Sequence, residues 1–159
     1  MPVNRDTIQA VLETVPQEAP FRFIDDILEL ESDRIVSTYT FKQDEYFYKG
    51  HFKDNPITPG VILIETMAQT GVVALGIYQL MEQGLGADQL REITPLFAFA
   101  DQIEFSGIVK PGDRVTIHGE KVYFRRGNIQ SKVHIADETG RFICNGLLTG
   151  AGVKINGKK

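Results

Sequence analysis

One long apolar helical stretch restricts the fold of this chain more than any other sequence feature. Pro59 and Gly60 open the stretch, and it runs to about Glu82. Proline suits the first turn of a helix, and the glycines at positions 84 and 86 end the pattern. Small residues lie within it at Ala68, Gly71, Ala74 and Gly76. A glycine inside a helix costs about 1 kcal/mol relative to alanine, so the stretch predicts that a sheet or a partner subunit packs very closely against it.

The segments on either side of this helix predict an α+β protein with one antiparallel sheet. Ile8, Val11 and Leu12 recur at helical spacing, which indicates a short helix over 5–14 capped by Asn4 or Asp6. Strand-like segments follow at 21–30, 35–41, 95–105, 114–124, 129–136 and 141–148. We therefore expect a single domain over 1–159, with a loop at 43–58, the long helix against one face of the sheet, and a tail at about 151–159.

Composition narrows the class of protein further. The net charge of −4 disfavours nucleic acid as the main ligand, because phosphate contacts need a basic surface. Glu65 and Gln69 interrupt the longest apolar stretch, which argues against membrane insertion. The N-terminus lacks the apolar core of a signal peptide, so a cytoplasmic location is expected. Cys144 is the only cysteine, and its strand-like surroundings predict a buried, unreactive thiol.

A histidine and a carboxylate near the start of the long helix are the candidate catalytic groups. His51 lies in a loop rich in Gly and Pro, and Glu65 lies in the helix. We expect the residues around Glu65 to be buried: Val61, Ile62, Leu63, Ile64 and Met67. A carboxyl group in such surroundings acquires a shifted pKa, so the pair suits general acid–base chemistry.

The helix start offers a third component of a catalytic site. The first backbone N–H groups, at Gly60 and Val61, have no partner within a helix, and the helix dipole there favours negative charge on a carbonyl oxygen. Glu65 lies about 7.5 Å further along the axis. One chain need not bring His51 and Glu65 together, because a symmetric dimer can place them side by side from two copies.

The residues of this window resemble a known family. Gly50-His51-Phe52, Asn55-Pro56, Pro59-Gly60-Val61, Glu65 and Met67-Ala68-Gln69 are similar to the central motif of the FabZ-type (3R)-hydroxyacyl-[acyl-carrier-protein] dehydratases of bacterial fatty acid synthesis. The spacing of fourteen residues from His51 to Glu65 matches that family. The resemblance covers about residues 16 to 150, with weaker similarity at Pro20-Phe21 and Asp25, at Val109–Asp113, and at Arg125-Arg126-Gly127.

This resemblance implies a hot-dog fold, in which an antiparallel sheet wraps around the long helix. It implies homodimers, often assembled as trimers of dimers, with active sites at the dimer interface and no metal or organic cofactor. The substrate is carried by acyl carrier protein. His51 matches the catalytic base, and Glu65 of the partner subunit matches the catalytic acid. Gly60 matches the residue whose amide holds the thioester carbonyl, Gln69 matches a glutamine that orients the acid, and Phe97 has the position of a residue that lines the acyl tunnel.

The chain departs from the family pattern at two places. His51-Phe52-Lys53-Asp54 replaces the usual His-Phe-Pro-Gly, and Leu96-Phe97 replaces a Tyr-Phe pair whose Tyr gates the tunnel, so the sequence does not predict acyl length. Glu65 stands where the related FabA-type dehydratase/isomerases have Asp, which favours dehydration without isomerisation. The alternatives are an acyl-thioester hydrolase and a non-catalytic hot-dog subunit of a synthase complex.

Other conspicuous residues have simpler interpretations. His118 and His134 have no accompanying motif, and no histidine has metal-ligand spacing, so we expect structural roles for both and no metal site. Phe97, Phe99 and Phe105 are expected mainly in the core. Three groups remain open: Tyr46-Phe47-Tyr48 either shields the pocket or packs, Arg125-Arg126 either docks the acidic carrier or forms a plain turn, and Lys154, Lys158 and Lys159 form either a basic patch or an exposed end.

Overall fold

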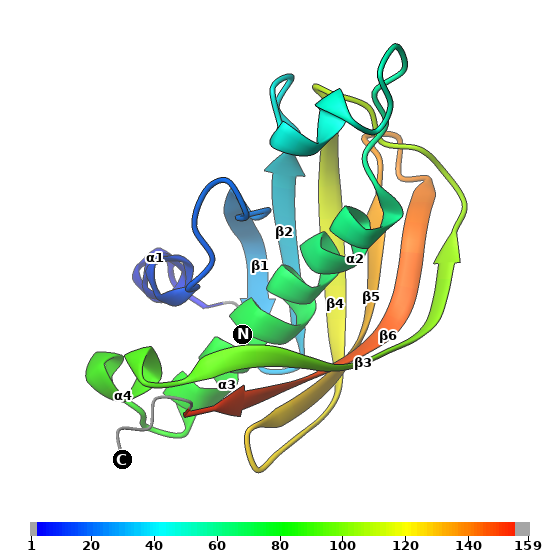
Figure 1. The fold of residues 1–159 in the computed structure, drawn as a ribbon. Helices are drawn as coiled ribbons and strands as arrows, with labels where there is room; N and C mark the ends of the chain where they lie inside the picture. Colours follow the sequence, from blue (N-terminus) through cyan, green and yellow to red (C-terminus); the bar gives the residue numbers. More distant parts are fainter. Residues whose placement is uncertain (1–2, 155–159) are drawn as a thin grey trace.

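A computed structural model describes residues 3–154, and it places one curved antiparallel sheet around one long helix (Figure 1). Across the sheet, the strands run β1 (Asp26–Glu31), β2 (Arg34–Thr40), β4 (Arg114–Arg125), β5 (Asn128–Ala136), β6 (Phe142–Val153) and β3 (Thr94–Phe105). Every neighbouring pair is antiparallel. The predicted α+β class, with a sheet wrapped around a central helix, is confirmed.

The long helix crosses the inner face of the sheet as α2 (Gly60–Ala68), a wider π-helical turn η2 (Gln69–Ala74) and α3 (Leu75–Glu82). The sheet is the close neighbour that its small residues predict. A Cβ on Gly71 would lie under 3.0 Å from Val133 Cγ2, and a Cβ on Gly119 would lie 3.0 Å from Gly71 Cα. Gly84, with a φ of +94°, ends the helix as expected.

The same helix is long and apolar enough to cross a membrane by length and composition. However, 72% of its most apolar window is buried inside the described fold. It is therefore a core helix, consistent with a soluble protein.

The remaining helices are short. The predicted first helix is α1 (Arg5–Thr14), where Asn4 Oδ1 accepts the Thr7 N–H at 2.9 Å as the N-cap. Two further elements were not predicted: the 3₁₀ turn η1 (Tyr46–Lys49) in the loop, and α4 (Ala87–Arg91) after the long helix.

Two predicted boundaries are wrong. The first strand begins at Asp26 rather than near residue 21, because the backbone groups of Phe21 and Phe23 are hydrogen-bonded to the Gln69 side chain of the helix. At the other end, β6 runs to Val153, so residues 151–153 belong to the sheet and not to a tail. Residues 155–159, including Lys158 and Lys159, lie outside the described residues.

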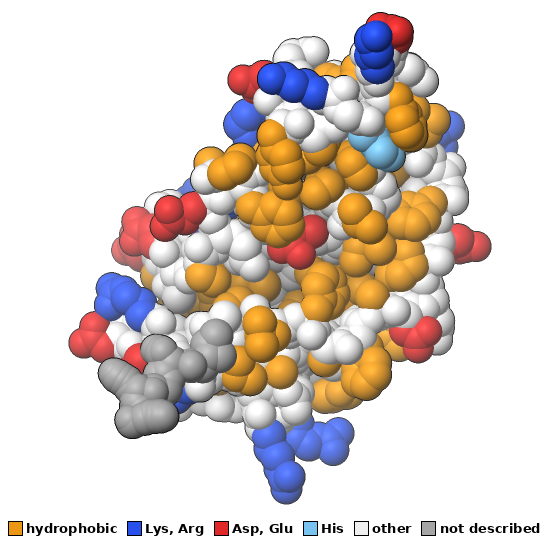
Figure 2. Space-filling view, viewed as in Figure 1, with side chains coloured by type: hydrophobic (Ala, Val, Ile, Leu, Met, Phe, Trp, Pro, Cys, Tyr) orange, Lys and Arg blue, Asp and Glu red, His pale blue; other side chains and the backbone are white. Residues whose placement is uncertain are grey.

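Several apolar residues expected in the core lie on the surface of the protomer. Val61 is 72% exposed, and the set on β3 is 46% exposed at Phe97, 69% at Phe99 and 49% at Phe105. β3 is an edge strand that pairs only with β6 among the described strands. Figure 2 shows the result: a broad hydrophobic area that includes the outward side of the helix. This surface has the composition of an interface rather than of a solvated face.

The outer face of the sheet holds the other two histidines. The rings of His118 and His134 stack with centroids 4.5 Å apart, and Phe142 continues the stack 4.0 Å from His134. Burial lowers the pKa of both imidazoles, that of His134 to about 4. Cys144 is fully buried, and burial raises the pKa of its thiol to about 12, in agreement with an unreactive role.

Candidate active site

His51 is half-buried in the loop that precedes the long helix, and one hydrogen bond determines the tautomer of its neutral ring. Its Nδ1 lies 2.8 Å from the carbonyl oxygen of Ile57. A carbonyl oxygen can only accept, so the proton of the neutral ring is on Nδ1 and Nε2 keeps a free lone pair. The Phe52 ring stacks on the imidazole at 4.0 Å. Nε2 is therefore the ring atom that is available to accept a proton.

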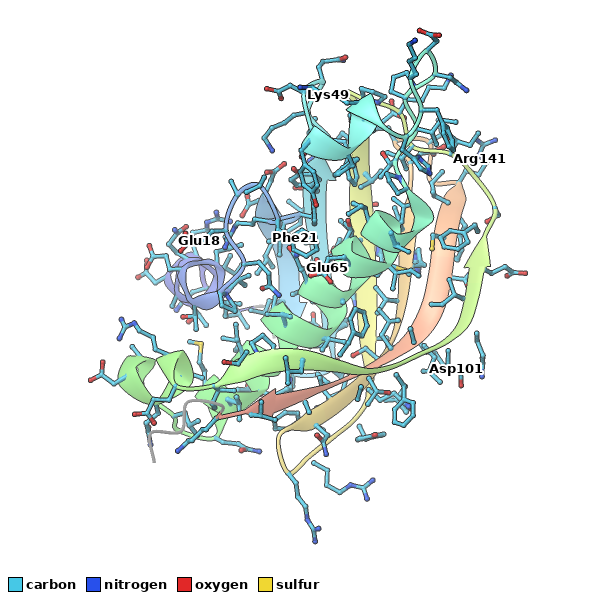
Figure 3. The ribbon with its side chains drawn as sticks, in the orientation of Figure 1. Glu18, Phe21, Lys49, Glu65, Asp101 and Arg141 are labelled. Atoms are coloured by element: carbon cyan, nitrogen blue, oxygen red, sulfur yellow. The ribbon has the colours of Figure 1, made fainter. Side chains whose placement is uncertain are left out.

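Glu65 lies half-buried on the outward side of α2, and Gln69 determines which of its oxygens is free. Gln69 Oε1 accepts the Phe23 N–H at 2.7 Å, so Nε2 is the donor end of the amide. Nε2 donates to Phe21 O at 3.0 Å and to Glu65 Oε2 at 2.8 Å. Figure 3 shows Phe21 and Glu65 near each other in the middle of the view. Glu65 Oε1 is the oxygen left free to carry a proton.

The surroundings of Glu65 favour its neutral form. Desolvation by burial raises the pKa of the carboxyl, and the hydrogen bond from Gln69 opposes part of that rise. Figure 2 shows an acidic side chain in the middle of the hydrophobic face, with histidine atoms toward one edge. A carboxyl with a raised pKa in an apolar surface suits a proton donor near neutral pH.

Gly60 is the first residue of α2, where backbone N–H groups point out of the helix. The hydrogen bonds of this turn begin with the N–H groups of Ile62 and Leu63, which both donate to Pro59 O at 2.9 and 3.2 Å. The Gly60 N–H precedes them and lies at the positive end of the dipole. A Cβ on Gly60 would lie 2.9 Å from Phe105 Cζ, so any residue other than glycine would have to displace the Phe105 ring.

Within one protomer the predicted site residues fall into two groups: Glu65 is in contact with Gln69, whereas His51 has a different hydrogen-bond partner. Gln69 is fully buried and donates directly to Glu65. The hydrogen bonds of the described residues do not join His51 to Glu65, since each has a different partner. Phe97 lies half-exposed on the edge strand. Within residues 3–154, no cluster of three His, Cys, Asp or Glu side chains could hold a metal ion.

Segment 21–23 has a part in the site that the sequence alone does not reveal. The Phe21 carbonyl and the Phe23 amide hold Gln69, and through it Glu65. These are backbone groups, so no residue type signals them. The apolar cavity under the second half of the helix was also missed; its lining includes Val72, Gly76 and Gly150, and neither His51 nor Glu65.

The fold defines the class of protein first. The dehydratase heterocomplex ApeI:P from Xenorhabdus doucetiae matches with a TM-score of 0.75 at 16% identity, over 91% of each chain. A hypothetical thioesterase protein with coenzyme A from Streptococcus pneumoniae TIGR4 matches with a TM-score of 0.56 at 17% identity, over 81% of this chain and 85% of that chain. The chain has the hot-dog fold that these proteins share.

Sequence comparison then gives the family. The model of the FabA-like domain matches residues 15–148. The 3-hydroxyacyl-[acyl-carrier-protein] dehydratase FabZ of Caldicellulosiruptor bescii is 34% identical over 142 residues, which cover 89% of this chain and 94% of the relative. FabZ of Symbiobacterium thermophilum is 38% identical over 117 residues, covering 73% and 76%. The chain belongs to the FabA-like family, and its relatives there include FabZ dehydratases.

Proposed function

We propose that this protein is a 3-hydroxyacyl-[acyl-carrier-protein] dehydratase of fatty acid or related lipid biosynthesis. It converts a (3R)-hydroxyacyl thioester into the trans-2-enoyl thioester and water. The FabZ relatives support dehydration as the reaction. The observation that carries the proposal is Glu65, a carboxyl of raised pKa that Gln69 holds on an exposed hydrophobic face, five residues after the open helix start at Gly60.

The proposed mechanism uses three groups in one elimination. The Gly60 N–H binds the thioester carbonyl oxygen and stabilises the negative charge that develops on it. His51 Nε2 removes a proton from C2, and the electron pair of that C–H bond forms the C2–C3 double bond. The C3–O bond breaks as Glu65 Oε1 gives its proton to the leaving hydroxyl, which departs as water. Proton return from the imidazolium to the carboxylate through solvent restores both groups.

A second copy of the chain completes the site in this proposal. Glu65 and Val61 lie on the outward side of α2, and the edge strand β3 exposes a row of aromatic side chains beside it. A two-fold dimer that covers this surface would bring Glu65 of one protomer toward His51 of the other. Phe97, on β3, would then line the acyl tunnel. Assembly of three such dimers is the further expectation from the family.

The acyl carrier protein is the proposed donor of the substrate, in the cytoplasm. Arg125 is the exposed last residue of β4 and Arg126 begins the turn to β5, with the Arg125 guanidinium 5.1 Å from the centre of the Tyr123 ring. We propose that this turn attracts the acidic carrier, an attraction that added salt would weaken. No organic cofactor has a part in the proposed reaction.

Incubation with a 3-hydroxyacyl thioester on acyl carrier protein tests the reaction. Enoyl absorbance is expected, and release of free thiol instead would identify an acyl-thioester hydrolase. His51→Ala and Glu65→Ala should each abolish turnover while the protein stays folded, and His118→Asn and Glu18→Gln serve as matched controls. Retained activity in Glu65→Ala would overturn its assigned role.

Mixing the two inactive variants tests whether two copies build one site. Random exchange makes half of the dimers mixed, and one of the two sites in each mixed dimer has both His51 and Glu65, so about a quarter of the wild-type activity should return. A site within one chain would give no recovery.

A further inference from the structure

A buried hydrogen bond joins the two ends of the loop that carries His51. The Tyr48 hydroxyl and Thr58 Oγ1 lie 2.6 Å apart, and the two residues are only 6% and 3% exposed. Tyr48 is the third residue of η1, and Thr58 is the second residue before Gly60. The bond therefore closes the loop that contains the proposed base, three residues after Tyr48, and it does so two residues before the proposed amide of Gly60.

Backbone hydrogen bonds continue from this pair toward the loop tip. The Ile57 N–H donates to His51 O at 2.9 Å, and His51 Nδ1 donates back to Ile57 O at 2.8 Å. Phe52 and Asn55 exchange two further bonds of 3.1 Å. The loop is thus a narrow hairpin whose base is the Tyr48–Thr58 pair. The imidazole is held to Ile57 in the loop segment just before Thr58, and this segment leads into the helix at Gly60.

Each member of the pair is also fixed from behind. The Thr58 N–H donates to Val109 O at 2.9 Å, and the Tyr48 N–H donates to Glu45 O at 3.1 Å. The ring of Tyr48 packs edge-on against Phe47 at 4.8 Å. Burial raises the pKa of Tyr48 to about 12, so the hydroxyl keeps its proton at any pH used in an assay. Both side chains are buried, so each hydroxyl is removed from bulk water.

We propose that Tyr48 and Thr58 are positioning residues that set the distance between His51 Nε2 and the Gly60 N–H. This inference rests on the proposed function, in which both atoms act on one thioester. The proton on C2 and the carbonyl oxygen are fixed relative to each other in the substrate, so base and amide must match that spacing. A displacement of about 1 Å in such an arrangement can lower a rate by about a hundredfold.

Single-atom changes at the pair test this proposal. Tyr48→Phe and Thr58→Val remove one hydroxyl each and keep the ring or the branched shape. Each should lower kcat by about tenfold to a hundredfold while KM changes little. The double variant should be no slower than the slower single variant, because both changes break the same bond. Thr58→Ser keeps the hydroxyl and should recover most of kcat. Tyr46→Phe is the matched control, since Tyr46 is 51% exposed.

Subunit mixing separates positioning from a general loss of folding. When the Thr58→Val protein is mixed with the Glu65→Ala protein, each mixed dimer has one site with an intact loop and an intact Glu65. The activity of the mixture should therefore rise above that of either variant alone. When the Thr58→Val protein is mixed with the His51→Ala protein, the only His51 in each mixed dimer lies in the altered loop. This mixture should show no such rise.

The results distinguish this inference from the proposed function. An inactive wild-type protein would contradict the dehydratase proposal itself. Wild-type activity with an unchanged kcat in Tyr48→Phe and Thr58→Val would overturn the positioning role alone. A loss of activity that Thr58→Ser does not recover, and that follows a matching fall in thermal stability, would assign the pair to folding and also overturn the inference.

Discussion

Two glycines on the long helix should respond in opposite directions to the same substitution. The carbonyl of Gly71 accepts a hydrogen bond from Ser131 Oγ at 2.7 Å, and Gly71 lies against the sheet. A methyl group there would lie within 3.0 Å of Val133 Cγ2 and 3.4 Å from its Cγ1. Val133 is 2% exposed and β-branched, so it cannot turn away freely. One turn and a little further along, a methyl group on Gly76 would meet only Ile129 Cγ2, at 3.7 Å.

The expected magnitudes follow from these contacts. Overpacking in a core costs about 1–3 kcal/mol, and alanine in a helix recovers about 1 kcal/mol of that relative to glycine. Gly71→Ala should therefore lower the free energy of unfolding by up to about 2 kcal/mol. Gly76 lines an apolar cavity, so a methyl group there would not clash with the sheet. Gly76→Ala should therefore raise the free energy of unfolding by up to about 1 kcal/mol, because alanine favours the helix over glycine.

Urea or thermal unfolding at one fixed protomer concentration measures both effects. For a protein of this size, 1 kcal/mol corresponds to about 2–4 °C in Tm. The concentration must match because an oligomer adds its association free energy to the apparent stability. If Gly71→Ala were as stable as the wild type or more so, the close approach of helix and sheet would be wrong. An equal loss in Gly76→Ala would show that the helix, rather than the contact with Val133, is intolerant of change.

Three further predictions concern titrating groups. The rate should fall as pH rises through the raised pKa of Glu65. Gln69→Leu should move that fall to higher pH, because the hydrogen bond from Gln69 lowers the pKa of Glu65. A shift of the pH profile of kcat to lower pH would contradict this prediction. His134 has a folded-state pKa of about 4 against 6.5 for the free group, so its contribution to stability is complete above about pH 6.5 and is lost as pH falls toward 4. His134→Gln should flatten the dependence of the unfolding free energy on pH in that window. An unchanged slope would show that His134 does not contribute to this pH dependence. Iodoacetamide should leave Cys144 unmodified in the folded protein near neutral pH and modify it fully in urea, as mass spectrometry can show.

The sequence predicts most of the architecture because its strongest signals are local. Helical spacing, Pro59 and Gly84 define the long helix, and the turn residues separate the last strands. The close contact at Gly71 followed from the cost of glycine in a helix. The start of β1 was misplaced because the backbone groups of Phe21 and Phe23 bond to the Gln69 side chain rather than to a neighbouring strand. Such a choice depends on a partner about 46 residues away, which no local pattern reveals.

The exposed apolar residues were the other failure, and it has one physical cause. The residue types of Val61 and Phe99 indicate that they favour an apolar environment. They do not indicate whether that environment is formed by the same chain or by another molecule. The candidate site shows the same division. His51, Gly60 and Glu65 came from a motif, whereas the bonds that orient them involve backbone groups and the Tyr48–Thr58 pair.

The edge strand β3 also determines how failed variants of this protein should be interpreted. Its twelve residues leave one side of the backbone without a strand partner within the described fold, and aromatic side chains flank that side. Unpaired strands of this length and composition are templates for precipitation. In the proposed dimer, a substitution that separates the protomers and uncovers β3 should therefore cause precipitation, and assays must normalise turnover to the concentration that stays soluble.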